Sequence, residues 1–104
     1  MRPLTGDRLI YENLLLLFFS DMKNAVLTEN VRAKITEFIQ VCHANDKMDG
    51  THIVETAEAL YSKGLGVSLR EIRKITNMSD ASIYRFRIKL VSSLGKFMAD
   101  EHDK

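Results

Sequence analysis

The chain has 104 residues, of which 45% are hydrophobic and 28% charged, and its formal net charge is +1. This length suits one domain, and the single proline and five glycines favour long helices over a turn-rich β fold. The one cysteine, Cys42, excludes an internal disulfide. We therefore predict a single compact helical domain over residues 1–104, all-α, with about five helices and no β wing.

The first predicted helix runs from about Asp7 to Val26 and is apolar over most of its circumference. A helix of this kind must be buried on nearly every side, and a second subunit is a natural way to bury it. We therefore predict a homodimer whose interface includes Leu14, Leu15, Leu16, Phe18 and Phe19.

The same apolar run has an alternative interpretation as a signal peptide or membrane span, because Arg2 and Arg8 precede it. The run covers only residues 14–19, far short of the roughly 20 residues that span a bilayer. Asp7 and Glu12 also do not suit the cationic start of a signal peptide. We expect no membrane association and a cytoplasmic location.

Two further helices are predicted before residue 64. Thr28 is a good N-cap for the second helix, and residues 45–50 form a polar connection rich in turn formers. Thr51 is the expected N-cap of the third helix, and Gly64 is suited to end it. The core-facing side of the second helix is expected to hold Val31, Ile35, Phe38 and Cys42. That of the third is expected to hold Ile53, Ala57 and Leu60, with Val54 and Tyr61 beside them.

Residues 68–86 carry the pattern that points to an activity. Ser68 and Glu71 have the Ser-x-x-Glu spacing of a capping box, which starts a short helix. Asn77 follows at a position where a tight turn between helices needs a left-handed residue. The inward side of this short helix is expected to hold Leu69, Ile72 and Ile75.

A last helix is predicted from the turn to about Ala99. Ser79 is its N-cap, Asp80 complements the helix dipole, and Met78 is the buried residue of the turn. Spacings of three and four residues define a core stripe of Ile83, Phe86, Leu90, Leu94 and Phe97. The outward face holds Ser82, Arg85, Lys89 and Lys96.

Positive charge is concentrated in this part of the chain. Residues 68–96 contain seven Lys and Arg against two acidic residues, a net +5, so the remainder carries −4. This distribution favours a nucleic-acid-binding segment on an acidic scaffold, and a solvated cationic helix face is the alternative.

The segment resembles the helix-turn-helix superfamily of bacterial and phage transcription regulators, through Glu71-Ile72, the Asn77-Met78-Ser79 turn and the Ser-Ile-Tyr-Arg-Phe run at 82–86. A weaker likeness, in length and motif position, is to small regulators of enterobacterial adhesin operons; plasmid and phage regulators are alternatives. Arg73 replaces the usual alanine and Thr76 the usual larger aliphatic, and both departures bear on the angle between the helices.

The resemblance implies that the second helix of the pair enters the major groove of double-stranded DNA. Its first residues would contact base edges, and Arg85 is the best candidate for bidentate contact with guanine. Arg87 and Lys89 are assigned to phosphates. The full predicted DNA-binding set is Arg70, Lys74, Ser79, Asp80, Ala81, Ser82, Tyr84, Arg85, Arg87 and Lys89.

Catalytic and metal-binding patterns are not found in the sequence. Cys42-His43 suggests a metal ligand or nucleophile, but there is no second cysteine, and His52 and His102 lack ligand spacing to His43. We interpret Cys42 as a buried structural thiol. No phosphate-binding glycine loop or catalytic triad can be assembled, so we expect no enzyme activity, no metal and no cofactor.

These patterns together predict a DNA-binding transcriptional regulator. Residues 1–45 would form bracing and dimerisation helices, and residues 51–99 the helix-turn-helix unit. The expected partners are double-stranded DNA, a second copy of the chain, and RNA polymerase or another regulator. The alternative is a helical protein–protein adaptor that uses the same helices without binding DNA.

Overall fold

The computed structural model describes residues 3–20, 27–62 and 69–102. Within these ranges the chain is all-α and contains no strand, which confirms the predicted fold class. The described helices are α1 (Asp7–Phe19), α2 (Glu29–Asp49), α3 (Ile53–Tyr61), α4 (Leu69–Thr76) and α5 (Asp80–His102).

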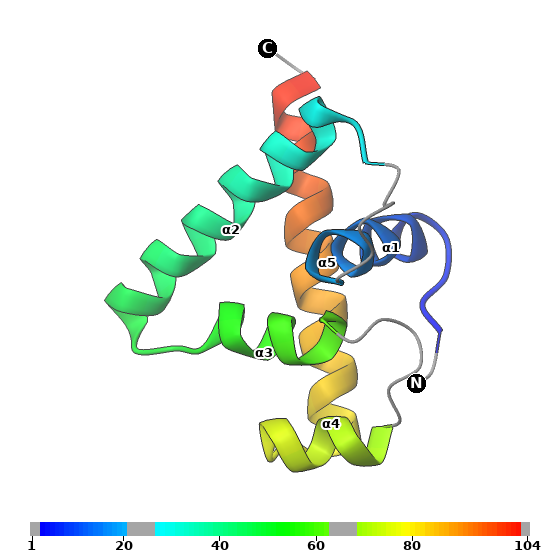
Figure 1. Ribbon diagram of the computed structural model, residues 1–104, viewed down its shortest axis with the longest axis vertical. Coiled ribbons are helices and arrows are strands. Elements are labelled where there is room, and N and C mark those ends of the chain that lie inside the picture. The colour runs from blue at the N-terminus through cyan, green and yellow to red at the C-terminus, as the bar shows by residue number, and fades with distance from the viewer. Residues whose placement is uncertain (1–2, 21–26, 63–68, 103–104) are drawn as a thin grey trace.

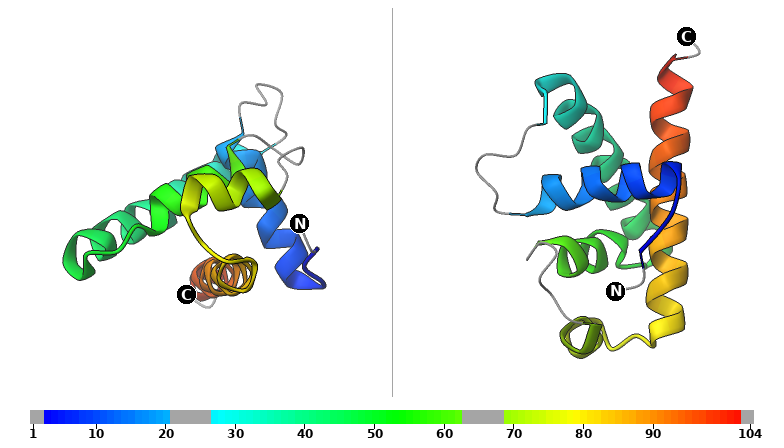
Figure 2. Two further views of the ribbon diagram at one scale, coloured as in Figure 1. Left: turned by 90° about the horizontal axis from the view of Figure 1, so that it is seen from below. Right: turned by 90° about the vertical axis from the view of Figure 1, so that its right-hand side faces the viewer.

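The long helix α5 is the element along which the others are arranged (Figure 1). Helices α1 and α2 contact α5, α1 and α2 contact each other, and both contact α3, which in turn contacts α4. Figure 2 shows α1, α3 and α4 following one another along the length of α5. The radius of gyration is 13.5 Å, close to the ~13 Å expected for a compact domain of this size. None of the described helices has the length and apolar character needed to cross a membrane.

Buried side chains from all five helices form one hydrophobic core. The predicted stripes of α2 and α3 lie in it, with Val31 and Ile53 at its margin. Cys42 is part of this core, as predicted, and burial raises the pKa of its thiol, with a further contribution from nearby Asp46. The fully buried side chains with the largest volumes are Tyr61, Leu15, Ile35, Leu60, Ile72, Ile83, Leu94 and Val91.

Helix α2 is longer than predicted. The polar residues 45–50 were expected to form a connection, but α2 continues through them to Asp49. Gly50 ends the helix with φ 67°, a left-handed conformation that glycine adopts without a Cβ clash. The predicted N-cap at Thr28 is confirmed, because its hydroxyl oxygen accepts a hydrogen bond from the Val31 N–H at 3.3 Å.

The start of α3 is capped from α2, which corrects the predicted cap at Thr51. The Asp46 carboxylate accepts hydrogen bonds from the backbone N–H groups of Ile53 and Val54 at 2.9 and 3.1 Å. The Thr51 hydroxyl donates to the same carboxylate at 2.6 Å. Partial desolvation acts to raise the pKa of Asp46, but these hydrogen bonds outweigh it and the pKa is lowered. One carboxylate therefore fixes the corner between α2 and α3.

Helix α1 ends earlier than predicted, at Phe19, because Ser20 has extended backbone angles. The rest of the predicted helix lies outside the described residues. Four of the five predicted interface residues are half-buried and pack against the core of the same chain: Leu14, Leu16, Phe18 and Phe19. Leu15 has no exposed surface, so its assignment to a dimer interface was wrong. The apolar surplus of α1 is thus largely covered within one chain.

Candidate nucleic-acid interface

The turn between α4 and α5 has the conformation that its sequence predicts. Asn77 adopts φ 56°, the left-handed conformation, and its N–H donates to the Arg73 carbonyl at 2.8 Å. Ser79 caps α5, since its hydroxyl oxygen accepts from the Ser82 N–H at 3.2 Å. Ser68, the first residue of the predicted capping box, lies outside the described residues.

The buried contacts of this helix pair differ in part from the prediction. Ile72 and Ile83 are completely buried and Met78 is half-buried. Ile75 was expected to face inward but is 52% exposed. The short α4 packs on α3 through the side of the helix that holds Ile72, and Ile75 lies outside this narrow contact.

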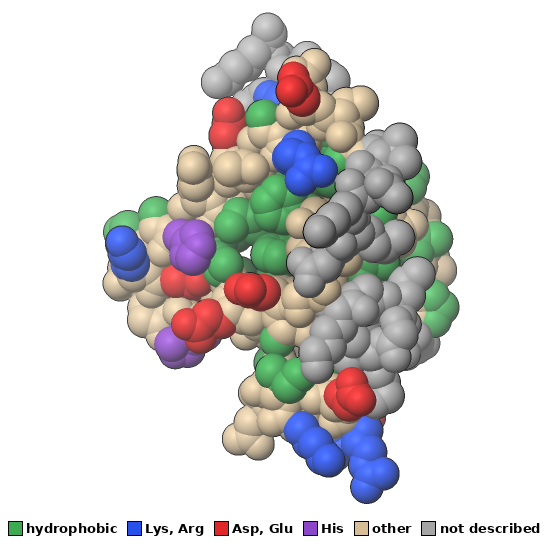
Figure 3. All heavy atoms as spheres, in the orientation of Figure 1, with side chains coloured by type: hydrophobic (Ala, Val, Ile, Leu, Met, Phe, Trp, Pro, Cys, Tyr) green, Lys and Arg blue, Asp and Glu red, His purple; other side chains and the backbone are tan. Residues whose placement is uncertain are grey.

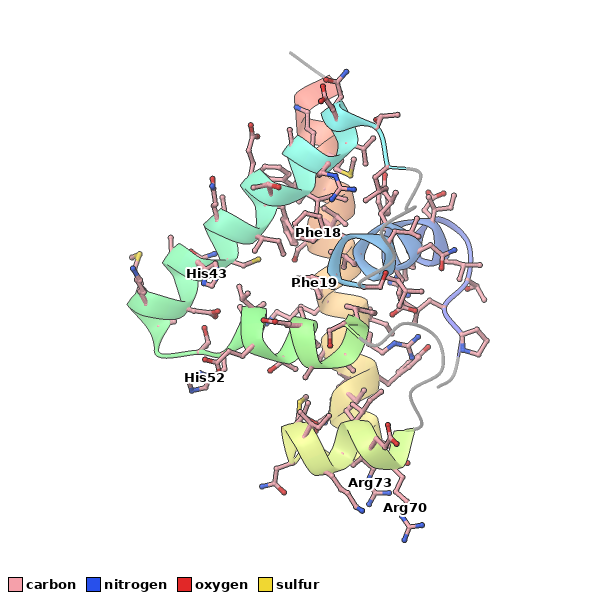
Figure 4. The ribbon with its side chains drawn as sticks, viewed as in Figure 1. Phe18, Phe19, His43, His52, Arg70 and Arg73 are labelled. Carbon is pink, nitrogen blue, oxygen red and sulfur yellow. The ribbon has the colours of Figure 1, made fainter. Side chains whose placement is uncertain are left out.

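The two residues that depart from the helix-turn-helix pattern, Arg73 and Thr76, both make local contacts. Arg73 is exposed, and its Nε lies 3.4 Å from the Asp80 carboxylate, so it bridges α4 to the start of α5. The Thr76 hydroxyl donates to the Ile72 carbonyl at 2.8 Å within α4. Figure 4 shows Arg70 and Arg73 on the side of α4 that points away from the body of the protein.

Exposed cations lie on α4 and on the first half of α5, and we call the four side chains Arg70, Lys74, Arg85 and Lys89 the basic face. Arg70 and Lys74 are exposed on α4, and Arg85 and Lys89 are exposed on α5. Basic side chains gather at the end of the molecule occupied by α4 (Figure 3). A recess of about 520 Å³ lies at this end over α4 and the turn that follows it, lined by Arg70, Arg73, Lys74, Asn77, Met78 and Ser79.

The other predicted contact residues at the start of α5 differ in their exposure to solvent. Ser79, Asp80 and Ala81 are exposed, whereas Ser82 and Tyr84 are half-buried. The Ser79 hydroxyl donates to the Ser82 hydroxyl oxygen at 3.0 Å, and Arg85 Nη2 lies 3.5 Å from that same oxygen. Ser82, which contacts the capping Ser79, is thus also a neighbour of Arg85, the side chain that the sequence selects as the main base contact.

Arg87 is not part of the basic face. It was predicted to hold a phosphate, but only 3% of it is exposed. Its Nε and Nη2 donate to the two carboxylate oxygens of Glu12 at 2.8 and 2.6 Å, a bidentate pair between α5 and α1. The Tyr61 hydroxyl of α3 donates to the same carboxylate at 2.7 Å. The prediction for Arg87 was wrong because the guanidinium is enclosed by these partners.

Burial and the Glu12 carboxylate shift the pKa values of Arg87 and Tyr61. Desolvation acts to lower the pKa of Arg87, but the hydrogen bonds and charge of Glu12 outweigh it and the pKa is raised. Burial and the neighbouring carboxylate raise the pKa of Tyr61. Arg87 therefore stays a cation and Tyr61 a neutral phenol, and their hydrogen bonds to Glu12 join α1, α3 and α5.

A signal for this cluster was present in the sequence. Arg87 follows Ile83 by four residues and precedes Leu94 by seven, so it falls on the core stripe of α5. Glu12 precedes Leu15 by three residues, so the two share one face of their helix. Opposite charges placed on the core faces of two helices indicate a buried ion pair, and this pattern separates Arg87 from the exposed cations.

The chain was compared with models of known protein families, with curated proteins and with solved structures, and none of the three comparisons found a match. Within the described residues, no group of three or more His, Cys, Asp and Glu side chains could hold a metal ion. The structure thus defines an all-α fold with an exposed basic face on two helices joined by a tight turn.

Proposed function

We propose that this protein is a sequence-specific DNA-binding transcriptional regulator that acts through α4, the turn at 77–79 and α5. The observation that carries the proposal is the basic face. Its exposed cations are Arg70 and Lys74 on α4 and Arg85 and Lys89 on the first half of α5. Lys and Arg side chains arranged along two helices are suited to the closely spaced phosphates of a duplex.

The proposed contacts follow from the position of each side chain. The start of α5 enters the major groove, where Arg85 pairs with guanine and Asp80, Ala81, Ser82 and Tyr84 face neighbouring bases. Arg70, Lys74 and Lys89 contact phosphates, and Ser79 adds its hydroxyl. Arg87 takes no part in contact and instead holds α5 against α1 and α3 through Glu12 and Tyr61.

Selection of duplexes from a random pool, followed by fluorescence anisotropy at several salt concentrations, tests the proposal. In the variant Arg85→Ala/Lys89→Ala, we expect the slope of log affinity against log salt to fall by about 2, because roughly one phosphate or base contact is lost per residue. Arg85→Ala alone should relax the preference for one base pair by about 1–3 kcal/mol.

The matched control is Arg32→Ala/Lys47→Ala, which removes the same charge from exposed positions on α2. It should bind the selected duplex as the native chain does. Undetectable duplex binding at low salt, or equal losses in both double variants, would refute the assignment of DNA binding to the basic face.

The proposed regulator acts as a homodimer, blocking or recruiting RNA polymerase at an operator. One recognition helix presents few base contacts, whereas two related by a twofold axis read half-sites about one helical turn apart. On α1, Leu9 and Ile10 are exposed beside the half-buried Leu14 and Phe18, which provides apolar surface for a second copy. Sedimentation should show a dimer at micromolar concentration and the selected site should be palindromic; a monomer would refute this part of the proposal.

A further inference from the structure

A large apolar recess opens between α2, α3 and α5. Its volume is about 550 Å³, within the range of about 300–1,000 Å³ typical of small-molecule sites. Hydrophobic side chains are visible inside the space between α2 and α3 (Figure 3). The apolar wall is formed mainly by Phe38, Val41, Ile53, Phe86, Leu90 and Phe97.

The recess follows from the way the long helices meet. The rings of Phe38 and Phe97 pack with centroids 5.7 Å apart and join α2 to α5. Helix α3, held at its corner by Asp46, spans the space between them (Figure 1). Val41 faces this recess and remains 47% exposed, so the structure leaves apolar surface open to solvent here.

The charged residues that line the recess are all positive. Lys89 and Lys96 line it and are exposed, and no acidic side chain is among the lining residues. The two lysines lie seven residues apart on α5, roughly 10 Å along the helix axis. The Ser93 hydroxyl between them donates to the Lys89 carbonyl at 2.9 Å. An anionic group at the recess would therefore be attracted by both lysines and could pair with either ammonium group.

We propose that this recess binds a single-chain amphiphile with an anionic head, of the chemical class of long-chain carboxylates. The hydrocarbon chain lies against Phe38, Phe86 and Phe97, and the carboxylate pairs with Lys89 or Lys96. The small-molecule volume of the recess and the two lysines beside its apolar wall favour such a ligand.

Isothermal titration calorimetry with dodecanoate below its micelle concentration tests the site directly, without DNA. We expect saturable binding of one dodecanoate per chain. Dodecyltrimethylammonium, with the same chain and the opposite charge, should bind at least about tenfold more weakly, because attraction to two lysines becomes repulsion. The variant Lys89→Gln/Lys96→Gln should weaken dodecanoate binding about fivefold or more and leave dodecanol binding unchanged.

A second pair of variants tests the location. Val41→Trp places a bulky ring at the recess and should abolish binding, whereas Met48→Trp, at an 82% exposed position outside the lining, should not. Circular dichroism and urea midpoints confirm that each variant is folded. Equal affinity for the anionic and cationic chains, non-saturable binding, or unchanged binding in folded Val41→Trp would overturn the proposal. A dimer that Val41→Trp dissociates and Met48→Trp does not would also overturn the proposal, because a second copy of the chain would then occupy the recess.

Lys89 belongs both to this recess and to the basic face. Given the proposed DNA binding, a carboxylate held by Lys89 would compete with a phosphate, and dodecanoate should lower duplex affinity severalfold. The calorimetric result does not depend on DNA, so failure of the ligand site and failure of the proposed function are distinguished. Calorimetric binding without any effect on duplex affinity would refute the competition while leaving the ligand site intact.

Discussion

The buried pair between Glu12 and Arg87 makes a quantitative prediction about stability. Both side chains are buried, and the Arg87 guanidinium donates two hydrogen bonds, of 2.8 and 2.6 Å, to the Glu12 carboxylate. Removing one partner leaves the other as an uncompensated buried charge, which typically costs about 3–5 kcal/mol. We therefore expect Glu12→Met and Arg87→Met each to lose a large part of a stability that is typically about 5–15 kcal/mol.

Replacing both partners should lower the free energy of unfolding by much less than the sum of the two single substitutions. In Glu12→Met/Arg87→Met no charge remains buried, and methionine side chains of similar length can pack in the same space. The Tyr61 hydroxyl loses its acceptor, at a cost of about 1–3 kcal/mol, and adding Tyr61→Phe should remove that cost. The double variant is thus expected to be more stable than either single variant.

Urea unfolding followed by circular dichroism at 222 nm measures these effects, with the slope m checked for constancy. Each single variant should also unfold at least about 12 °C lower than the native chain. Additive losses, with the double variant equal to the sum within about 0.5 kcal/mol, would refute the reasoning. If the chain binds duplex DNA as proposed, Arg87→Met should show the salt dependence of the native chain at a temperature where it is folded, because Arg87 is buried against Glu12.

Further predictions concern four other residues. Asp46→Ala should cost about 1 kcal/mol in urea unfolding by removing the α3 cap. Because folding lowers the pKa of Asp46, the native chain should lose this stabilisation as pH falls below the ordinary value of 3.8, whereas Asp46→Asn should show a flatter acid limb. Gly95→Ala would place a Cβ 2.8 Å from the Tyr11 ring and should destabilise, but in a Tyr11→Ala background the same change should stabilise by up to about 1 kcal/mol. Asn77→Ala should cost about 1 kcal/mol and Asn77→Gly very little, because φ is 56°. Cys42 should resist iodoacetamide in the native state and react after unfolding, and rapid native alkylation would contradict its burial.

Local patterns predicted the elements that depend on neighbouring residues. Thr28 and Ser79 cap α2 and α5 as expected, and Asn77 has the left-handed conformation that the turn requires. These caps and this turn depend on contacts between residues at most four apart in the sequence, so one side chain is enough to determine the local backbone conformation. The predicted break at 45–50 failed because turn-forming residues have only a weak preference, which the continuing hydrogen bonds of α2 overcome.

The sequence alone determined the helical class, the core stripes of α2 and α3, and the tight turn before α5. It also placed Arg70, Lys74, Arg85 and Lys89 at exposed positions, because helical periodicity separates outward from inward residues. The tertiary structure alone decided that Arg87 is a buried tie to Glu12, that Asp46 caps a helix other than its own, and that an apolar recess remains open. The physical reason is distance along the chain: Glu12 and Arg87 meet across 75 residues, and only the packing of α1 against α5 brings them together.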